Sequence, residues 1–203
     1  MKIAHFSVEG MEFYGSVEGD RVRAIQGSIF GDFTVTGLSF PLTSITLLPP
    51  TRPTHFWGIG ENYPYHVRFR VEQFGQEVAT RAKRFTPWHK GASAVVASGQ
   101  LVIMPVNAEV FEYEGELCIV IGRPARKVSI DDAPDYILGY TVSNDISSEG
   151  SWHDDFSHWR RKGCDTFGPV GPWIATTGEP HHLDISTRVN GVVEDQGNTK
   201  DMV

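Results

Sequence analysis

Short runs of alternating apolar and polar residues fill the first fifty positions of the chain. The runs and the turn dipeptides between them lie at residues 2–7, 9–10, 11–17, 19–20 and 21–25. Because a period of two is typical of strands and such dipeptides favour tight turns, the pattern predicts a small antiparallel β domain over residues 1–50. The proline cluster within residues 49–53 cannot lie inside a helix or a central strand, so we place a domain boundary near residue 50.

Beyond residue 50 the period changes to that of a helix and then returns to strands. Apolar residues recur at steps of four, three, four and four from residue 67 to residue 82, which predicts a helix over residues 63–83 with Asn62 as its cap. Predicted strands follow at residues 94–97, 101–104, 113–121, 136–143, 173–176 and 183–189. A short helix is expected over residues 151–161. These elements favour a mainly β (α+β) fold with a second domain over residues 51–203.

Composition and charge narrow the range of partners. The chain has 203 residues, of which 40% are hydrophobic, and its 18 Lys and Arg against 25 Asp and Glu give a net charge of −7. This balance disfavours binding to nucleic acid or anionic lipid. The apolar runs are far shorter than the ~20 residues of a membrane helix, and two cysteines suit neither a disulfide framework nor a zinc site. We expect a cytoplasmic protein with free thiols that binds neither nucleic acid nor membranes.

An acidic pair leads into the most apolar predicted strand. Glu114 and Glu116 are two residues apart, so their side chains leave a strand on the same face, about 6.5 Å apart along the backbone. A solvated strand edge would explain such a pair, but fusion to an apolar run indicates burial, where like charges repel strongly. A bound cation would remove that repulsion. Asp145 ends the next apolar strand and is placed to complete an all-oxygen site for a hard divalent cation, although a turn or a helix cap also explains it.

Two further side chains are candidates for chemistry. Lys162 precedes a Gly- and Pro-rich loop at residues 168–172 that would hold it rigidly to neutralise an oxyanion or a substrate carboxylate, with a surface lysine as the alternative. His66 lies one turn into the predicted helix, away from the apolar face, where it would titrate near neutrality; a polar surface position is the alternative. The Gly58-Ile59-Gly60 segment lacks the third glycine and the βαβ context of a dinucleotide site, so that function is set aside.

Taken in order, these segments resemble the fumarylacetoacetate hydrolase (FAH) family. The similar motifs are Asn62-Tyr63-x-x-His66, Lys90-Gly91-Ala92-Ser93, Tyr113-Glu114-Gly115-Glu116-Leu117, Asn144-Asp145-Ile146-Ser147, Lys162-Gly163-Cys164-Asp165-Thr166-Phe167, Gly171-Pro172-Trp173 and Arg188-Val189-Asn190-Gly191. They extend over nearly the whole chain. Each motif alone is modest support, whereas their shared order and spacing are hard to obtain by chance.

The resemblance implies a mixed β-roll catalytic domain with a small N-terminal β domain, and a bound Mg²⁺ or Mn²⁺ ion. The metal ligands that it implies are Glu114, Glu116 and Asp145. It also implies that Tyr63 and Lys162 bind the substrate and that His66 is the general base, with Lys162 acting in catalysis too. Family members process small 2-oxo acids or β-dicarbonyl compounds by C–C bond hydrolysis, hydration, isomerisation or decarboxylation through a metal-stabilised enolate. The resemblance further implies a homodimer and a role in the breakdown of aromatic or sugar-derived acids.

Three departures from the family pattern bear on activity. The glutamate that pairs with the histidine in many relatives is Phe69 here, and an arginine that helps to bind the anionic substrate is Glu149. The chain also ends before the C-terminal loop that closes the site in relatives, so we expect a C-terminally incomplete catalytic domain. An alternative therefore stays open, namely a catalytically impaired relative that binds metal and ligand without turnover. A purely structural β domain is a third hypothesis.

Overall fold

The chain is mostly strand in the computed structural model, which describes residues 1–60, 62–74, 86–150 and 158–202. The strands are β1 (Lys2–Val8), β2 (Met11–Glu18), β3 (Arg21–Gly27), β4 (Phe33–Pro41), β5 (Thr46–Leu47), β6 (Phe56–Gly60), β7 (Thr86–Lys90), β8 (Val95–Ala97), β9 (Ala108–Glu112), β10 (Gly115–Ile121), β11 (Ile137–Asn144), β12 (Ser147–Gly150), β13 (Gly168–Ala175), β14 (Asp184–Val189) and β15 (Val192–Asn198). The helices are α1 (Pro64–Phe74) and α3 (Trp159–Lys162), with short 3₁₀ turns at η1 (Leu42–Ser44), η2 (Ala92–Ala94), η3 (Ala133–Tyr136), η4 (Pro180–His182) and η5 (Thr199–Asp201). The predicted mainly β fold is confirmed.

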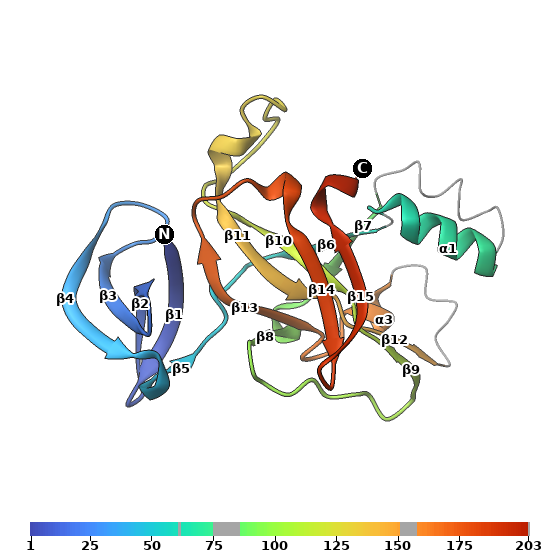
Figure 1. The fold of residues 1–203 in the computed structure, drawn as a ribbon, viewed down its shortest axis with the longest axis horizontal. Coiled ribbons are helices and arrows are strands. Elements are labelled where there is room, and N and C mark those ends of the chain that lie inside the picture. The colour runs from blue at the N-terminus through green and yellow to red at the C-terminus, as the bar shows by residue number, and fades with distance from the viewer. Residues whose placement is uncertain (61, 75–85, 151–157, 203) are drawn as a thin grey trace.

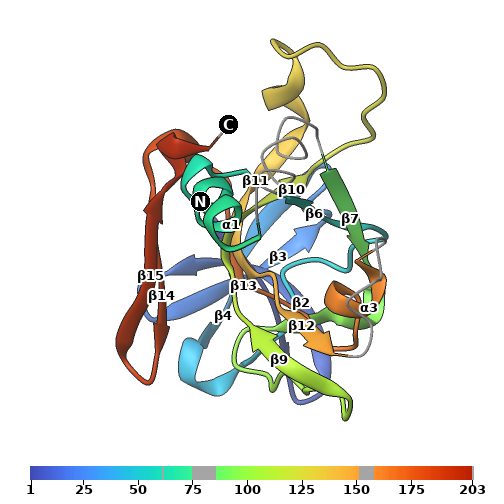
Figure 2. The same ribbon diagram turned by 90° about the vertical axis from the view of Figure 1, so that its right-hand side faces the viewer.

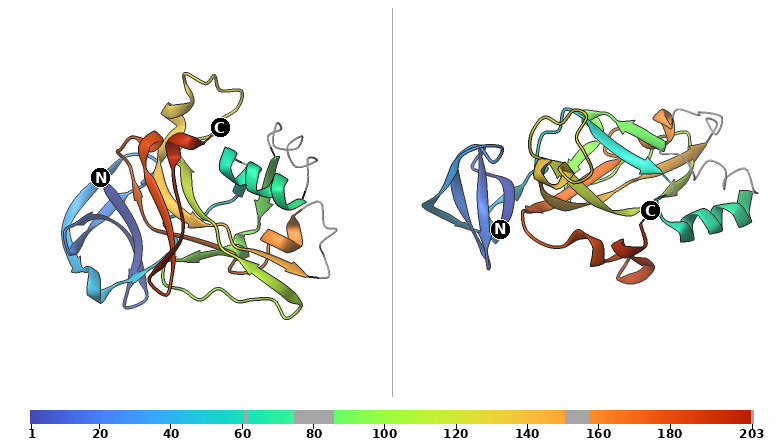
Figure 3. Two further views of the ribbon diagram at one scale, coloured as in Figure 1. Left: turned by 45° about the vertical axis from the view of Figure 1, so that its right-hand side comes forward. Right: turned by 90° about the horizontal axis from the view of Figure 1, so that it is seen from above.

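The N-terminal strands form antiparallel hairpins that continue into the sheet of the remaining chain. β1 pairs with β2, β2 with β3, and β3 with β4. β1 also pairs with β13, with Lys2 opposite Ala175 and Ile3 opposite Ile174. The main path of the sheet is therefore β10-β11-β13-β1-β2-β3-β4. Figures 1 and 3 show β1 to β4 as a lobe at one end of the molecule. A division into domains at residue 50 stays a proposal.

Two apolar clusters lie on opposite faces of β1, because successive side chains of a strand alternate between faces. Ile3 packs with Ile174 of β13, and Val120 of β10 packs against them. Ala4 and Phe6 belong to the second cluster, inside the N-terminal hairpins. The first cluster therefore fixes the N-terminal lobe against the strands that carry the acidic residues.

The two predicted helices are confirmed in part, because the described residues Tyr63 and His158 lie just outside the observed helices. Helix α1 begins at Pro64, within the helix predicted over residues 63–83, and residues 75–85 lie outside the described part of the chain. Helix α3 covers Trp159–Lys162, whereas residues 151–157 of the second predicted helix also lie outside it. Neither described helix is long and apolar enough to cross a lipid bilayer.

Two predictions about the strands are wrong. Residues 101–104 form a loop, in which Leu101 is 84% exposed and the Ile103 N–H donates to Thr166 Oγ1 at 2.8 Å. The acceptor of that hydrogen bond is a side chain and not the backbone of a neighbouring strand. The apolar run is therefore not paired into a sheet. Residues 168–172 are the first half of β13 and not a loop. Pairing with β8 on one side and β11 on the other outweighs the weak strand propensity of Gly and Pro.

Pairing of β10 with β11 brings the two acidic segments together. Gly115 lies opposite Asn144, so Glu114 and Asp145 fall side by side just beyond the paired residues. The β14–β15 hairpin packs against this end of β10, since a Cβ atom on Gly115 would lie 2.6 Å from Thr187 Oγ1. Figure 2 shows the hairpin along one side of the molecule.

The close contact of β11 with β13 predicts that Gly139 tolerates no side chain. A Cβ atom there would lie 2.3 Å from the carbonyl oxygen of Ala175 and 2.7 Å from Ile174 Cγ2. We expect Gly139→Ala to lower the free energy of unfolding by about 1–3 kcal/mol, measured by urea denaturation. Gly197→Ala is the control, because its Cβ would meet nothing within 4 Å, and its stability should stay within about 0.5 kcal/mol of the wild type. Equal stability of the two variants would contradict the packing.

Candidate metal centre

Three carboxylates from two neighbouring strand ends converge in space. One carboxylate oxygen from each of Glu114, Glu116 and Asp145 lies within 4.8 Å of the others. Glu114 immediately precedes β10, Glu116 is on β10, and Asp145 immediately follows β11. The structure therefore gathers the three residues that the sequence selects as candidate metal ligands.

Backbone hydrogen bonds hold the acidic segments in register. The Asp145 N–H donates to the Glu114 carbonyl oxygen at 2.8 Å, and the Glu114 N–H donates to Asn144 Oδ1 at 2.9 Å. These two bonds extend the β10–β11 pairing by one step past its last paired residues. The two carboxylates are consequently fixed through the backbone and do not depend on a ligand to bring them together.

Lys162, at the end of α3, reaches the same cluster. Its Nζ atom donates to Glu114 Oε2 at 2.7 Å and to Asp145 Oδ2 at 2.5 Å, and its side chain is only 8% exposed. The loop thought to orient Lys162 is a strand, so α3 positions it instead. The ammonium group partly neutralises two carboxylates in a place where water is largely excluded.

Lys90 is a second ammonium group of the cluster, and sequence reasoning does not select it. Its side chain is 2% exposed, and Nζ donates to the carbonyl oxygens of Ile146, Lys162 and Phe167 at 3.0, 2.7 and 2.9 Å. The same Nζ lies 2.6 Å from Asp145 Oδ1. The sequence signal that could have indicated burial of Lys90 is the period of two in β7, which places Lys90 on the same buried face as Trp88.

Both oxygens of the buried Asp145 carboxylate contact an ammonium group. Lys162 Nζ donates to Oδ2, and Lys90 Nζ lies 2.6 Å from Oδ1 while it donates to three carbonyl oxygens. A bound cation would therefore share this carboxylate with the two lysines. Oxygen ligands around a six-coordinate Mg²⁺ at about 2.1 Å lie about 3.0 Å apart when adjacent and about 4.2 Å apart when opposite, so the three carboxylates would move closer together to hold the ion. The residues present thus fit a hard divalent cation.

Crowding of the carboxylates changes their acidity. Burial and the charges of Glu114 and Asp145 raise the pKa of Glu116 to about 8. Burial also raises the pKa of Glu114, with Lys162 partly opposing the shift. Burial alone would raise the pKa of Asp145, but Lys162 and Lys90 outweigh it and hold that pKa below its usual value. Glu116 and Glu114 therefore hold a proton more readily than an ordinary carboxyl group, and Asp145 less readily.

The two lysines differ in acidity. Burial alone would lower the pKa of Lys162, but Glu114 and Asp145 outweigh it and raise the pKa above its ordinary value. Burial lowers the pKa of Lys90, and Asp145 only partly offsets that effect. Lys162 is thus an ammonium group at neutral pH and suits the stabilisation of negative charge, not the removal of a proton.

Tyr63 lies close to the cluster. Its hydroxyl group is buried and finds no hydrogen-bond partner among the residues that the structure describes. Burial raises the pKa of Tyr63, and the charges of Glu116 and Asp201 raise it further. The hydroxyl is thus a protonated donor near Glu116. His66 is half-buried in the first turn of α1, and its role as general base stays a prediction.

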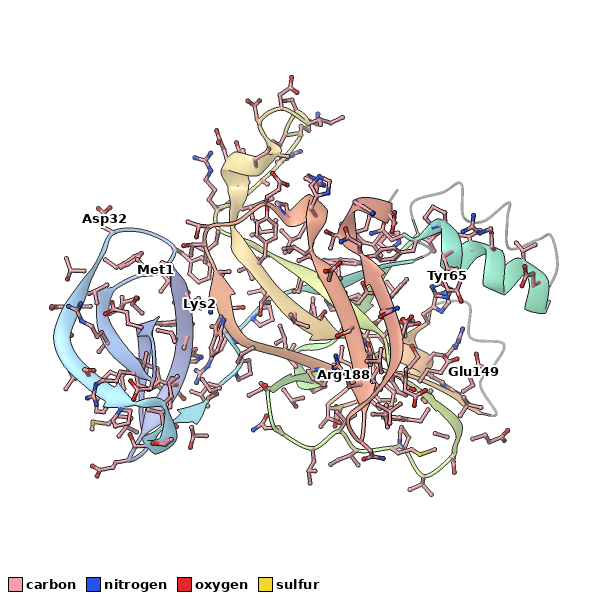
Figure 4. The ribbon with its side chains drawn as sticks, in the orientation of Figure 1. Met1, Lys2, Asp32, Tyr65, Glu149 and Arg188 are labelled. Atoms are coloured by element: carbon pink, nitrogen blue, oxygen red, sulfur yellow. The ribbon has the colours of Figure 1, made fainter. Side chains whose placement is uncertain are left out.

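Glu149 and Phe69 are the residues that depart from the family pattern. The Glu149 carboxylate on β12 accepts a hydrogen bond of 2.5 Å from Arg161 of α3. Figure 4 shows Glu149 in the region of α3. Arg161 is 12% exposed and lies 3.9 Å from Glu112 as well. Glu149 therefore neutralises a largely buried guanidinium. The side chain of Phe69 lies outside the described part of the chain.

Comparison with known proteins identifies the family. The family described as "Fumarylacetoacetate (FAA) hydrolase C-terminal" matches residues 55–203, and "Rv2993c-like, N-terminal" matches residues 1–50. The chain therefore belongs to the FAA hydrolase family of enzymes, and the resemblance found in the motifs is confirmed.

Relatives of the chain catalyse different reactions. It is 30% identical to 2,4-didehydro-3-deoxy-L-rhamnonate hydrolase of Sphingomonas sp., over 100% of this chain and 74% of that protein. It is 32% identical to the human mitochondrial oxaloacetate tautomerase, over 80% of this chain and 52% of that protein. The crystal structure of 2-hydroxyhepta-2,4-diene-1,7-dioate isomerase from Mycobacterium marinum superimposes with a TM-score of 0.87 at 33% identity, over 100% of this chain and 76% of that one.

The raised pKa of Glu116 predicts that cation binding releases a proton. Because the carboxyl group is protonated below about pH 8, the affinity for Mg²⁺ should fall about tenfold per pH unit from pH 8 to pH 6. Calorimetric titration in two buffers of different ionisation enthalpy measures both the affinity and the protons released. Glu116→Gln lacks this carboxyl group, so its weaker binding should depend less steeply on pH over the same range and release fewer protons. Wild-type affinity that is independent of pH would contradict the assignment.

The contacts of Lys90 predict a large structural cost for its removal. Lys90→Met leaves three carbonyl oxygens and Asp145 without their buried cation, so we expect a loss of about 3–5 kcal/mol in the free energy of unfolding. Lys90→Arg should not restore stability, because a planar guanidinium cannot reproduce the ammonium geometry. Lys127→Met, at an exposed position, is the control for urea denaturation. A Lys90→Met protein as stable as the control would refute this role.

Proposed function

We propose that this chain is a divalent-metal-dependent enzyme that acts on a small 2-oxo acid or β-dicarbonyl compound through an enolate. The reaction is C–C bond hydrolysis, or the related hydration, isomerisation or decarboxylation. The observation that carries the proposal is the convergence of Glu114, Glu116 and Asp145, with the Lys162 ammonium in contact with two of them. The names of the hydrolase, tautomerase and isomerase relatives support the same range of reactions.

Mg²⁺ or Mn²⁺ is the ion that suits this donor set, since hard divalent cations prefer carboxylate oxygens. Glu114, Glu116 and Asp145 would hold it. When bound, the ion would supply Lewis-acid polarisation of the substrate oxygens. A thiolate site for a softer metal is disfavoured, because none of the three ligands is a cysteine.

The charge balance supports an anionic substrate. With a divalent ion bound, three ionised carboxylates and the two ammonium groups of Lys90 and Lys162 would leave the cluster with one net positive charge. A 2-oxo acid carries one negative charge, which the site would neutralise.

Each chain residue has a separate task in this proposal. Lys162 binds the substrate and stabilises negative charge that develops on its oxygen, because an ammonium group in a dry site acts strongly on a nearby anion. Tyr63 donates to the substrate its hydroxyl, which has no hydrogen-bond partner within the described residues. His66 moves the proton, because an imidazole can both accept and donate one.

Several finer points are proposals of the same kind. We place the protein in the cytoplasm, in the breakdown of aromatic or sugar-derived acids, and as a homodimer. The alternative is a binding relative without turnover, which the departures at Phe69 and Glu149 favour.

A substrate screen tests the proposed function. Purified protein is assayed with acylpyruvates, oxaloacetate and 2-oxo-4-enoates, with Mg²⁺, with Mn²⁺ and with a chelator. We expect turnover that requires the ion and is lost in Glu116→Gln. Ion binding without turnover of any of these compounds would support the binding relative instead. Failure to bind either ion would refute the proposed metal site.

Lys162→Met separates ion binding from chemistry. The ammonium of Lys162 contacts two of the three candidate ligands and would repel a bound cation, so its removal should tighten Mg²⁺ binding by about tenfold. Turnover should nevertheless fall at least about 100-fold, because the group that stabilises developing charge is gone. Calorimetry and steady-state kinetics measure the two effects, with Lys127→Met as the control. Full turnover in Lys162→Met would exclude a catalytic role for this lysine.

A further inference from the structure

Trp88 is the other neighbour of the Lys162 ammonium group. Lys162 Nζ lies 4.4 Å from the centroid of the Trp88 ring, within the range of a cation–π interaction. Trp88 is 8% exposed, on the same face of β7 as Lys90. The ammonium therefore lies between two carboxylates and the face of a buried aromatic ring.

Two glycines of β6 form the seat of this ring. Gly58 lies opposite Trp88 in the β6–β7 pairing. A Cβ atom on Gly58 would lie 2.3 Å from Trp88 Nε1, and one on Gly60 would lie 2.6 Å from Trp88 Cζ3. Any larger residue at either position would push the indole away. The Gly58-Ile59-Gly60 segment, which does not fit a dinucleotide site, thus has a packing role.

Hydrogen bonding does not explain why a tryptophan occupies this position. Trp88 Nε1 is buried and has no hydrogen-bond partner in the described ranges of the chain. An unpaired buried N–H group opposes folding, so the indole is not held by its polar atom. Its ring, in contrast, meets the Lys162 ammonium and packs closely against the glycine seat.

Lys162 is also fixed at its backbone. Its carbonyl oxygen accepts a hydrogen bond from Lys90 at 2.7 Å, so both ends of the residue have partners from β7. The carboxylate partners of the ammonium belong to two of the three candidate metal ligands. The ring of Trp88 is the contact for which an ion does not compete.

We propose that Trp88 is a positioning residue for Lys162, and that Gly58 and Gly60 hold its ring in place. The ring face keeps the ammonium dry and directed at the carboxylate cluster. The catalytic consequence rests on the proposed function, whereas the contact itself does not. Loss of the π face should therefore disturb Lys162 even in the absence of metal and substrate.

A double-mutant cycle on the full chain tests the contact in the presence of a chelator. Trp88→Leu, Lys162→Met and the double variant are compared with the wild type by urea unfolding. We expect a coupling of about 5- to 30-fold in the unfolding equilibrium constant, the size of a desolvated cation–π pair. Lys2 and Trp173 form the matched control, because Lys2 Nζ lies 5.1 Å from that ring but Lys2 is exposed, and their coupling should not exceed about 5-fold. Coupling of Trp88 with Lys162 below about 2-fold would overturn the proposal.

Tryptophan fluorescence tests the contact between Trp88 and Lys162 if the Trp88→Leu protein does not fold. The emission of Trp88 is obtained by subtracting the emission spectrum of folded Trp88→Phe protein from that of the folded wild type. Lys162→Met should change this difference spectrum, because it removes the charge over the ring. In the Trp88→Phe background the same substitution should leave the emission unchanged. An unaltered Trp88 spectrum in Lys162→Met would refute the contact.

Kinetics tests the consequence for catalysis. Trp88→Leu should lower kcat by about 10- to 100-fold at unchanged Mg²⁺ affinity, since a misplaced group costs rate more than binding. Trp88→Phe, which keeps a π face, should restore most of the loss, and Gly58→Ala should reproduce the Leu defect. Equal kcat in the Leu and Phe variants would show a packing role only. Absence of turnover in the wild type would count against the proposed function, while the cycle and the fluorescence would still decide the contact.

Discussion

The structure depends on the burial of three carboxylates beside two ammonium groups. Two like charges at about 4 Å repel by about 4 kcal/mol at the effective dielectric of a protein, so the cluster cannot form unless that energy is offset. Lys162 offsets it at Glu114 and Asp145, Lys90 offsets it again at Asp145, and Glu116 takes up a proton. Every element around the cluster is arranged so that these charges stay together.

Lys90 also explains how distant segments are joined. Its ammonium binds carbonyl oxygens just after β11, at the end of α3 and just before β13, and these positions are 56, 72 and 77 residues further along the chain. One side chain thus connects the segment that carries Asp145 with the helix that carries Lys162. The ammonium group of Lys90 therefore both offsets the charge of Asp145 and holds these segments together.

The local part of the site could be predicted from the sequence, and the long-range part could not. Glu114 and Glu116 share a face because strands have a period of two, and Asp145 ends a strand of clear apolar pattern. The roles of Lys90 and Trp88 depend on carbonyl oxygens and glycines from other segments, which no local pattern contains. The same limit explains the wrong predictions for residues 101–104 and 168–172, where the presence or absence of a pairing partner decided the outcome.

Lys162 links the fold to the proposed chemistry. Its ammonium contacts Glu114 and Asp145, two of the three candidate metal ligands, and so offsets part of their repulsion. An ion bound to these carboxylates would leave the ammonium group of Lys162 with fewer partners. Glu114 and Asp145, which raise the pKa of Lys162, would still lie nearby. A negatively charged substrate is then the natural new partner, because an unpaired ammonium in a dry site is costly. Loading of the ion and readiness for an anionic substrate would thus be two consequences of one exchange of partners.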